Sequence, residues 1–315
     1  MTLNTGEKIL KKIYIISAVI FALLVLILGV FGILLVGSSF GSGNIALIDL
    51  NGPISSQTTQ AGIFSEYEPN VDDYIGWIED AAEDSGTEAI VIKINSPGGE
   101  VIASEKLARS IKSASEKKVV VAYIETMGAS AAYQAASSAD YIVAERQSLV
   151  GNIGVRLETI HYYGLMEKLG VNVTTIKSGE YKDIGSPTRP MTEEEQKMLE
   201  SIVDESYCEF ISWVAENRNM TINETLQVAE GKIYSGIQAE KVGLVDMTGT
   251  EDDAIDIAAK MANISDPNVY RYETQSSGIL GINLNDMSYA LGYGIGKGLS
   301  QTSLEDSVRS YQMYY

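Results

Sequence analysis

Cysteine and histidine occur only once each in the 315-residue sequence, as Cys208 and His161. A single cysteine cannot form an internal disulfide bond or a cysteine-based metal cluster. Zinc sites in proteins are usually built from histidine and cysteine ligands, so a zinc site here would depend almost wholly on carboxylates. A catalytic triad that uses histidine would have only one candidate base. We therefore expect no metal and no cofactor.

Basic residues are also scarce. The 23 lysines and arginines stand against 42 aspartates and glutamates, which gives a net charge of −19. Nucleic-acid-binding proteins usually gather basic side chains into a patch, and no stretch of this sequence does so. The charge argues against nucleic acid as a partner, whereas the 45% hydrophobic composition is typical of a folded protein.

One long uncharged apolar segment, residues 13–36, lies near the N-terminus. As a helix it would span about 36 Å, enough to cross a hydrocarbon core of about 30 Å. Three lysines precede it, and no lysine or arginine follows until Lys93. By the positive-inside rule, we expect a single-pass protein of the cell membrane with residues 1–12 in the cytoplasm and the catalytic domain outside. A cleaved signal peptide is the alternative, but its apolar region is usually only about 7–15 residues long.

The rest of the chain alternates between apolar β-branched runs and segments with helical periodicity. A Gly/Ser linker at 37–44 comes first. The predicted strands cover 45–50, 89–94, 118–124, 141–144, 171–177 and 269–271. A helix is predicted over 157–169, and a capping box formed by Thr192 and Glu195 predicts the start of a long one. The pattern indicates an α/β fold over residues 45–275, followed by a Gly-rich tail at 276–315.

Ser130 lies in a run of small residues, Gly128-Ala129-Ser130-Ala131-Ala132, directly after a predicted strand. This pattern predicts a turn into a helix. Backbone N–H groups at a helix N-terminus have no partner within the helix, so they can bind the oxyanion that forms when a hydroxyl attacks a carbonyl group. Ser130 is therefore a candidate nucleophile. The pattern lacks the final glycine of the Gly-x-Ser-x-Gly elbow, and a helix packed closely on a sheet would also need small residues.

A second Gly-rich turn follows the predicted strand 89–94. Gly98 and Gly99 would let the backbone turn sharply and present bare N–H groups, although an ordinary strand-to-helix turn has the same composition. Parallel strands deliver their carboxyl ends to one edge of a sheet, where ligands bind in open α/β folds. We expect this turn and the Ser130 turn to lie at the same edge.

A serine hydroxyl needs a base to take its proton. His161 lies inside the predicted helix 157–169 beside two tyrosines, where a structural role is the simpler interpretation. Lysine is a known alternative base, but a free lysine has a pKa of about 10.4, so a lysine base must be kept neutral by apolar surroundings. The pattern does not select among the thirteen lysines that follow residue 36.

Four stretches, in this order behind the apolar segment, resemble the signal peptide peptidase A (protease IV) family of serine peptidases. They are residues 95–99, 127–133, 151–155 and 178–183. The resemblance implies the ClpP/crotonase fold, with repeated β-β-α units, and a Ser-Lys dyad. By motif, Ser130 is implied as the nucleophile and Lys182 as the general base, with Gly98, Gly99 and the N–H of Ala131 as the oxyanion hole.

One position departs from the family pattern. Family members usually have a serine, thought to hydrogen-bond the catalytic lysine, where this chain has Asn152. An asparagine side chain offers a carbonyl acceptor for the lysine amine, so the lysine-orienting role could survive the change.

The resemblance also implies substrates and assembly. The family forms ring-like oligomers on the outer side of the membrane and digests signal peptides left behind after secretion. We therefore expect a membrane-anchored serine endopeptidase that acts through an acyl-enzyme on signal peptides or other apolar extended peptides. We also expect a homo-oligomer that contacts the lipid bilayer through residues 13–36.

Three alternatives stay open at this point. One is a related membrane-bound Ser-Lys protease that cuts a specific membrane protein. Another is a crotonase-like acyl-CoA enzyme, which shares the paired N–H oxyanion hole, and the third is a catalytically dead scaffold. The triplets that begin at Asn172, Asn219, Asn223 and Asn263 fit the glycosylation pattern, and only an outside location would allow their modification.

Overall fold

The computed structural model describes residues 21, 23, 43–57 and 69–272. The chain divides into two units, Met1–Gly43 and Asn44–Tyr315. The predicted cytoplasmic segment 1–12, nearly all of the predicted membrane helix 13–36 and the tail 276–315 lie outside the described residues. None of the helices within the described ranges is both long enough and apolar enough to span a bilayer.

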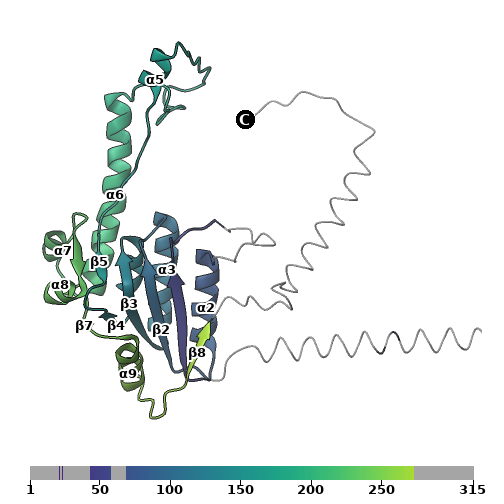
Figure 1. Cartoon of the computed structure of the whole chain (residues 1–315), viewed down its shortest axis with the longest axis vertical. Helices are drawn as coiled ribbons and strands as arrows, with labels where there is room; N and C mark the ends of the chain where they lie inside the picture. Colours follow the sequence, from purple (N-terminus) through teal and green to yellow (C-terminus); the bar gives the residue numbers. More distant parts are fainter. Residues whose placement is uncertain (1–20, 22, 24–42, 58–68, 273–315) are drawn as a thin grey trace, which may run out of the picture. The chain divides into compact units, whose positions relative to one another are not determined.

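The described residues of the second unit form one eight-stranded sheet flanked by helices, so the fold is α/β as predicted (Figure 1). Six strands run in the order β6-β5-β3-β2-β1-β8, while β4 pairs with β3 and β7 pairs with β4. All pairings are parallel except that of β5 with β6. The strands are β1 (Ile45–Asn51), β2 (Ala89–Ser96), β3 (Val119–Ala129), β4 (Tyr141–Ala144), β5 (Leu149–Gly151), β6 (Ile233–Ser235), β7 (Met247–Thr248) and β8 (Val269–Tyr272).

Strand β3 changes neighbours along its length. Val121–Ile124 pair with β4, and Met127–Ala129 pair with β5. On its other side the register with β2 shifts between Ile94 and Ser96. The end of β3 therefore lies between the ends of β2 and β5, which brings three chain turns together at one edge of the sheet.

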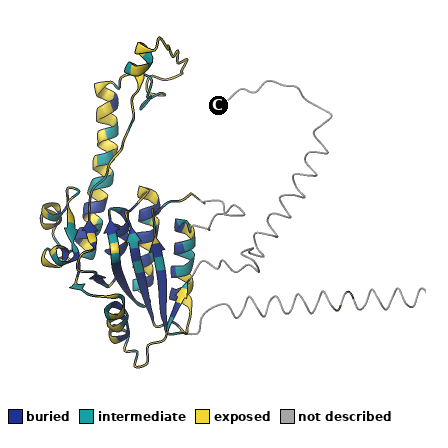
Figure 2. Ribbon diagram, viewed as in Figure 1, coloured by how far each residue is buried: buried dark blue, intermediate teal, exposed yellow. Residues whose placement is uncertain are grey.

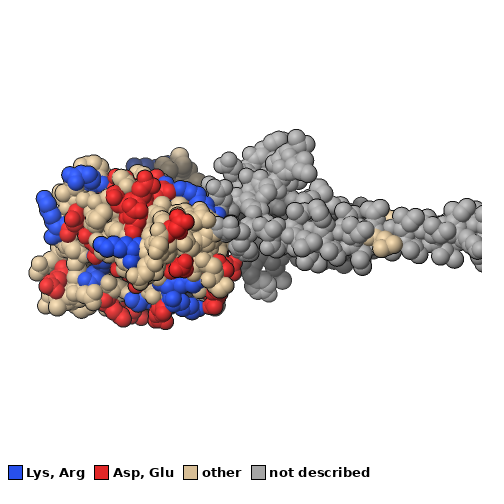
Figure 3. Space-filling model, turned by 90° about the horizontal axis from the view of Figure 1, so that it is seen from below, with Lys and Arg blue, Asp and Glu red and all other residues tan. Residues whose placement is uncertain are grey.

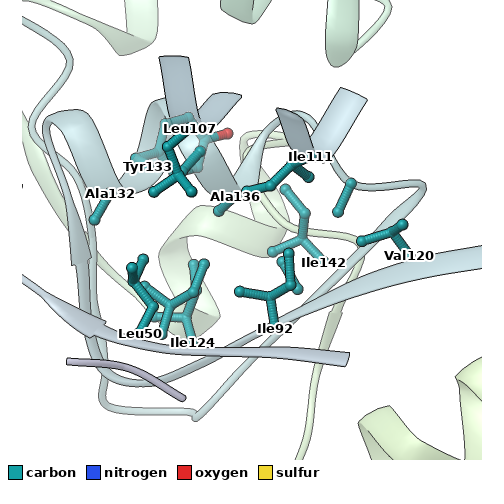
Figure 4. Close-up of a cluster of buried hydrophobic side chains, with 14 of the residues drawn as sticks. Leu50, Ile92, Leu107, Ile111, Val120, Ile124, Ala132, Tyr133, Ala136 and Ile142 are labelled. Atoms are coloured by element: carbon teal, nitrogen blue, oxygen red, sulfur yellow. The ribbon is translucent and has the colours of Figure 1, made fainter. Parts of the chain in front are cut away.

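Helices cover both faces of the sheet. The helices α2 (Val71–Glu83), α3 (Val101–Ser115) and α4 (Ala131–Ala136) pack on one face, and α9 (Glu251–Met261) packs on the other. Successive strand residues point to opposite faces. Figure 4 shows Ile92 and Ile124 facing Leu107, Ile111 and Tyr133 in the larger core. Because both faces are covered, the central strands are buried almost throughout, as Figure 2 shows.

Ion pairs tie α9 to the strands beneath it. Glu251, the first residue of α9, lies 2.8 Å from the Lys93 ammonium on β2 and 2.5 Å from the Arg271 guanidinium on β8. Lys93 also pairs with Glu125 on β3 at 2.7 Å. On the face drawn in Figure 3, acidic and basic side chains are interspersed. The acidic excess of the sequence is thus not gathered into one patch on this face.

A long arm, residues 156–209, extends away from the sheet (Figure 1). It contains α5 (Tyr163–Lys168), in which no residue is buried, and most of α6 (Glu193–Asn217). The capping box of Thr192 and Glu195 is confirmed at the start of α6. Apart from Glu195, the buried residues of α6 lie near its C-terminal end, at Phe210, Ile211, Val214 and Ala215. The short helices α7 (Ile222–Val228) and α8 (Gly236–Lys241) lie beside that end.

Two predictions for the arm are wrong. The predicted strand 171–177 is irregular and exposed, and the predicted helix 157–169 is reduced to α5, so that His161 lies before it. The apolar side chains that suggested burial belong to a segment outside the sheet, where no neighbouring strand pairs with them. Apolar periodicity predicted contact with this chain's own core, and the arm does not make that contact.

Candidate active site

Ser130 lies between the last residue of β3 and the first residue of α4. Its backbone is at φ 55° and ψ −124°, a left-handed conformation that is rare for a residue with a side chain. Such strain costs about 1–3 kcal/mol and persists only where the surroundings impose it. Here the Ser130 amide donates a 2.8 Å hydrogen bond to the carbonyl of Gly151 at the end of β5. This geometry is that of a serine held on a sharp strand-to-helix turn, which is how α/β hydrolases expose a nucleophile.

The small residues around Ser130 also meet a packing demand. Ala131, Ala132, Ala135 and Ala136 are all buried in α4. Close packing of a helix on the sheet, the alternative interpretation of the small residues, therefore holds for Ala131 and Ala132. It does not explain the strained backbone of Ser130, which packing alone does not require.

The Gly98–Gly99 turn lies directly against Ser130. Gly98 has φ 97°, and a β-carbon there would lie 2.8 Å from both the Ala131 nitrogen and the Ser130 β-carbon. A β-carbon on Gly99 would lie 1.9 Å from the carbonyl oxygen of Ile54. Both positions therefore need glycine, because backbone from two other segments fills the space.

Ile54 holds this turn in place by strand-like pairing. Its amide donates to the Gly98 carbonyl at 2.9 Å, and its carbonyl accepts from the Glu100 amide at 2.9 Å. In such a parallel bridge the amide of the intervening residue, Gly99, points away from Ile54. Nothing in the sequence marked Ile54 for this role, since it lies in a stretch that reads as a surface loop.

The three amides proposed for an oxyanion hole are not equivalent. The Gly98 amide donates to Ser96 Oγ at 3.2 Å. For the amides of Gly99 and Ala131, no acceptor is found within the described residues. Two N–H groups from different turns thus remain available beside Ser130, and Gly98 contributes by allowing the turns to approach.

Asn152 follows β5 on the other side of the Ser130 turn. Gly151 is in register with Ala129, so Asn152 and Ser130 come directly after a pair of adjacent strand residues. Asn152 adopts φ 51°, a conformation that asparagine tolerates well, and its amide donates to the Lys232 carbonyl at 2.7 Å. The structure therefore gathers Gly98, Gly99, Ser130, Ala131 and Asn152 at one sheet edge.

Lys182 lies elsewhere, in an exposed turn of the arm. Its neighbour Asp183 is bound by Arg189 through two hydrogen bonds of 2.8 and 2.9 Å and by Lys177. Arg189 also donates to Glu195 in the first turn of α6, at 2.8 Å. The pKa of the Asp183 carboxyl falls below its ordinary value because of hydrogen bonds from Arg189 and then Lys177. Hydrogen bonds, first from Arg189 and then from the Thr192 amide, lower the pKa of Glu195 to about 2. We call Lys177, Asp183, Arg189 and Glu195 the arm clamp.

The arm clamp joins Lys182 to the end of α6 that is far from the sheet. From Glu195 to the buried Phe210, the helix rises by about 22 Å at ~1.5 Å per residue. Figure 1 shows the segment around α5 at that distant end, while β3 ends at the sheet edge. Within one chain, therefore, the structure does not bring Lys182 to Ser130.

Comparison with known proteins identifies the family. Residues 112–265 match the model of Peptidase family S49. A candidate protease of Methanocaldococcus jannaschii is 47% identical over 300 residues, which cover 93% of this chain and 95% of the relative. The chain belongs to peptidase family S49.

Two further relatives agree with this S49 assignment. A candidate signal peptide peptidase of Enterococcus faecium is 32% identical over 74% of this chain and 68% of its own length. A candidate protease of Synechocystis is 36% identical over 73% of this chain and 78% of its own length. The S49 chain is thus a serine-type peptidase of the signal peptide peptidase A family.

Proposed function

We propose that this S49 peptidase is a membrane-anchored endopeptidase that cleaves remnant signal peptides through an acyl-enzyme on Ser130, with Lys182 as general base. The observation that carries the proposal is the strained Ser130 beside the available amides of Gly99 and Ala131. The proposal includes the ClpP/crotonase arrangement, in which paired amides from two turns bind an oxyanion.

The reaction follows from this placement. Ser130 Oγ attacks the peptide carbonyl carbon while its proton passes to the lysine amine, and the oxyanion accepts hydrogen bonds from Gly99 and Ala131. When the C–N bond breaks, the lysine ammonium returns a proton to the leaving amine. A water molecule, deprotonated by the same amine, then attacks the ester and releases the acid and Ser130.

We propose that Lys182 reaches Ser130 of a second copy. The two residues are separated within one chain, and the arm exposes large apolar side chains that a monomer would leave in water. Ile176 is 97% exposed, and Ile160, Leu165 and Leu169 are also exposed. Exposed apolar groups concentrated on one segment usually mark an interface. Docking would also remove Lys182 from water, which disfavours the charged form of an amine. Asn152 would then receive the lysine amine through its side-chain carbonyl.

The substrate class rests on the chemistry around the turn. Val101 and Ile102 are exposed directly after the Gly98–Gly99 turn, and Leu149 is exposed on β5. Apolar side chains at this edge favour an apolar, extended peptide. The name of the Enterococcus faecium relative points to the same substrate. The membrane anchor at 13–36, with the catalytic domain outside, completes the proposal.

The main alternative functions require different residues and different substrates. A protease that cuts one membrane protein would share the site but would not degrade free signal peptides. A crotonase-like acyl-CoA enzyme would use the paired amides without needing Ser130 or Lys182. A catalytically dead scaffold would hydrolyse nothing.

The test uses the full-length protein in detergent with casein and a synthetic signal peptide. We expect Ser130→Ala and Lys182→Ala to abolish hydrolysis, while Lys168→Ala, on the same arm, leaves it unchanged. Activity that survives either of the first two substitutions would overturn the dyad.

Co-expression tests where the dyad forms. If each site takes its serine from one copy and its lysine from another, an equal mixture of Ser130→Ala and Lys182→Ala chains should regain roughly a quarter of the sites in a random assembly. No recovery from co-assembled chains, although each variant folds, would place both residues in one chain.

A further inference from the structure

The two candidate oxyanion donors belong to turns that open two different helices. Gly99 lies in the turn that leads into α3, and Ala131 is the first residue of α4. An oxyanion hole works only if its two N–H groups are held at the right separation before the charge forms. Small displacements of such groups reduce rates strongly. The contact between α3 and α4 therefore bears directly on the site.

Ser104 makes that contact. It lies on α3 with only 1% of its surface exposed. Its hydroxyl lies 3.2 Å from the carbonyl oxygen of Ala131 and 2.5 Å from Oε1 of Gln134, both on α4. In the described part of the chain, the hydrogen-bond contacts between α3 and α4 come from this one hydroxyl, whose single hydrogen is shared between the two acceptor oxygens. The first of these contacts reaches Ala131 itself, the residue that follows Ser130 and carries one of the two candidate oxyanion donors.

Ser104 and Gln134 form a polar pair that differs from the residues around it. Gln134 is the one long polar side chain in α4, whose other residues are alanines and a tyrosine. A buried hydroxyl and a buried amide each need a hydrogen-bond partner, a requirement that an alanine and an apolar residue at these two positions would not have. A second serine on α3 provides the contrast, because Ser110 Oγ is buried with no hydrogen-bond partner. Of these two serines, only Ser104 links α3 to α4.

We propose that Ser104, with Gln134, is a positioning residue for the oxyanion hole. It holds Ala131 on α4 at a fixed place relative to α3, whose preceding turn supplies the Gly99 amide. It touches neither substrate nor the reacting atoms, so it acts on the chemical step and not on peptide binding. This inference rests on the proposed peptidase function.

The experiment compares Ser104→Ala with the matched control Ser110→Ala in the full-length enzyme. We expect Ser104→Ala to lower kcat by about 10- to 100-fold, below the full loss of an oxyanion donor, with KM nearly unchanged. A peptide aldehyde, whose adduct with Ser130 needs the oxyanion hole, should inhibit Ser104→Ala more weakly by a similar factor. Ser110→Ala should match the wild type in kcat, KM and aldehyde inhibition.

Gln134→Met provides a second route if Ser104→Ala folds poorly. It removes the partner amide while preserving side-chain length, and we expect the same fall in kcat. If both residues act through one link, the double variant should lose no more than Ser104→Ala alone.

The inference is overturned if Ser104→Ala behaves as Ser110→Ala does, or if its loss lies wholly in KM. An inactive wild type, or an active Ser130→Ala variant, would instead overturn the proposed function and is recognised before Ser104 is tested.

Discussion

Gly98 packs so closely on Ser130 that a β-carbon on the glycine would lie 2.8 Å from the β-carbon of the serine. Real β-carbons essentially never approach so closely, and the same added carbon would meet the Ala129 carbonyl oxygen and the Ala131 nitrogen. The turn after β2 and the turn after β3 thus contact each other closely through their backbone atoms. The first prediction follows from this contact.

Gly98→Ala should fold but lose activity. The methyl group must push the Ala131 amide aside, and alanine at φ 97° adds backbone strain of about 1–3 kcal/mol. We expect kcat/KM on a signal peptide to fall by about 100-fold or more, because an oxyanion donor is displaced. The control is Gly76→Ala in α2, where the added carbon meets nothing within 4 Å. That variant should keep full activity and gain about 0.5–1 kcal/mol from helix propensity. A folded Gly98→Ala enzyme with normal kcat/KM would contradict the prediction.

Ser130→Gly should be more stable than Ser130→Ala, although both are expected to be inactive. At φ 55° and ψ −124°, glycine relieves a strain that alanine retains. We expect a net gain of about 1 kcal/mol after allowing for the greater freedom of glycine in the unfolded chain, which corresponds to roughly 2–4 °C in Tm. Thermal unfolding of the two variants measures the difference. Equal Tm values would show that the serine turn is not strained.

The arm clamp should make the effect of Arg189 depend on pH. The pKa values of Asp183 and Glu195 are lowered in the folded state, chiefly by hydrogen bonds from Arg189. A carboxylate of this kind stabilises the folded state above its unfolded pKa and loses that contribution as the pH falls through its folded pKa. The unfolded values are 3.8 for the aspartate and 4.5 for the glutamate.

We therefore expect Arg189→Gln to lower Tm by a constant amount above about pH 5, and the gap should shrink as the pH falls toward about 2. Arg156→Gln is the control on the same arm, since the Arg156 side chain is 90% exposed. A gap that stays constant, or widens, in acid would mean that the two carboxylates do not stabilise the arm through Arg189.

Arg218 should contribute more to stability than a surface arginine does. Its side chain is 8% exposed and donates to Asp246 at 2.7 and 2.9 Å and to the Gly243 carbonyl at 3.1 and 3.2 Å. Arg218→Met would leave Asp246 without its cation, and we expect a loss of about 2–4 kcal/mol in the free energy of unfolding. Arg109→Met is the comparison, because Arg109 is 58% exposed and its pair with Glu105 should contribute no more than about 0.5 kcal/mol. Urea denaturation of both variants measures the two losses. Equal losses would contradict the prediction.

The sequence predicted the centre of the sheet well. The predicted strands 45–50 and 89–94 correspond to β1 and β2, because a strand buried on both faces has a continuous apolar run that few other structures share. Strand β3 was predicted to end at residue 124, yet it continues to Ala129. The small residues of its last part have no strand pattern of their own, and they form a strand because β2 and β5 flank them.

The site was predictable only where its residues follow strands directly. Ser130 and the Gly98–Gly99 turn could be placed at one edge because parallel strands share their carboxyl ends. Ile54, Ser96 and Ser104 could not be found in this way. Their roles depend on hydrogen bonds to residues that are distant in sequence, and no local pattern records such a bond.

What the sequence determined by itself is local: the buried strands, the capping box that starts α6, and the Gly- and Ala-rich turns that follow two strands. Tertiary structure alone decided that the arm projects from the sheet and carries Lys182 away from Ser130. Apolar periodicity indicates that one face of a segment is buried, but it does not show whether the same chain or another molecule covers that face. The position of a segment on the arm depends instead on the packing of the C-terminal end of α6 against the rest of the protein. The sequence of the segment itself does not encode that packing.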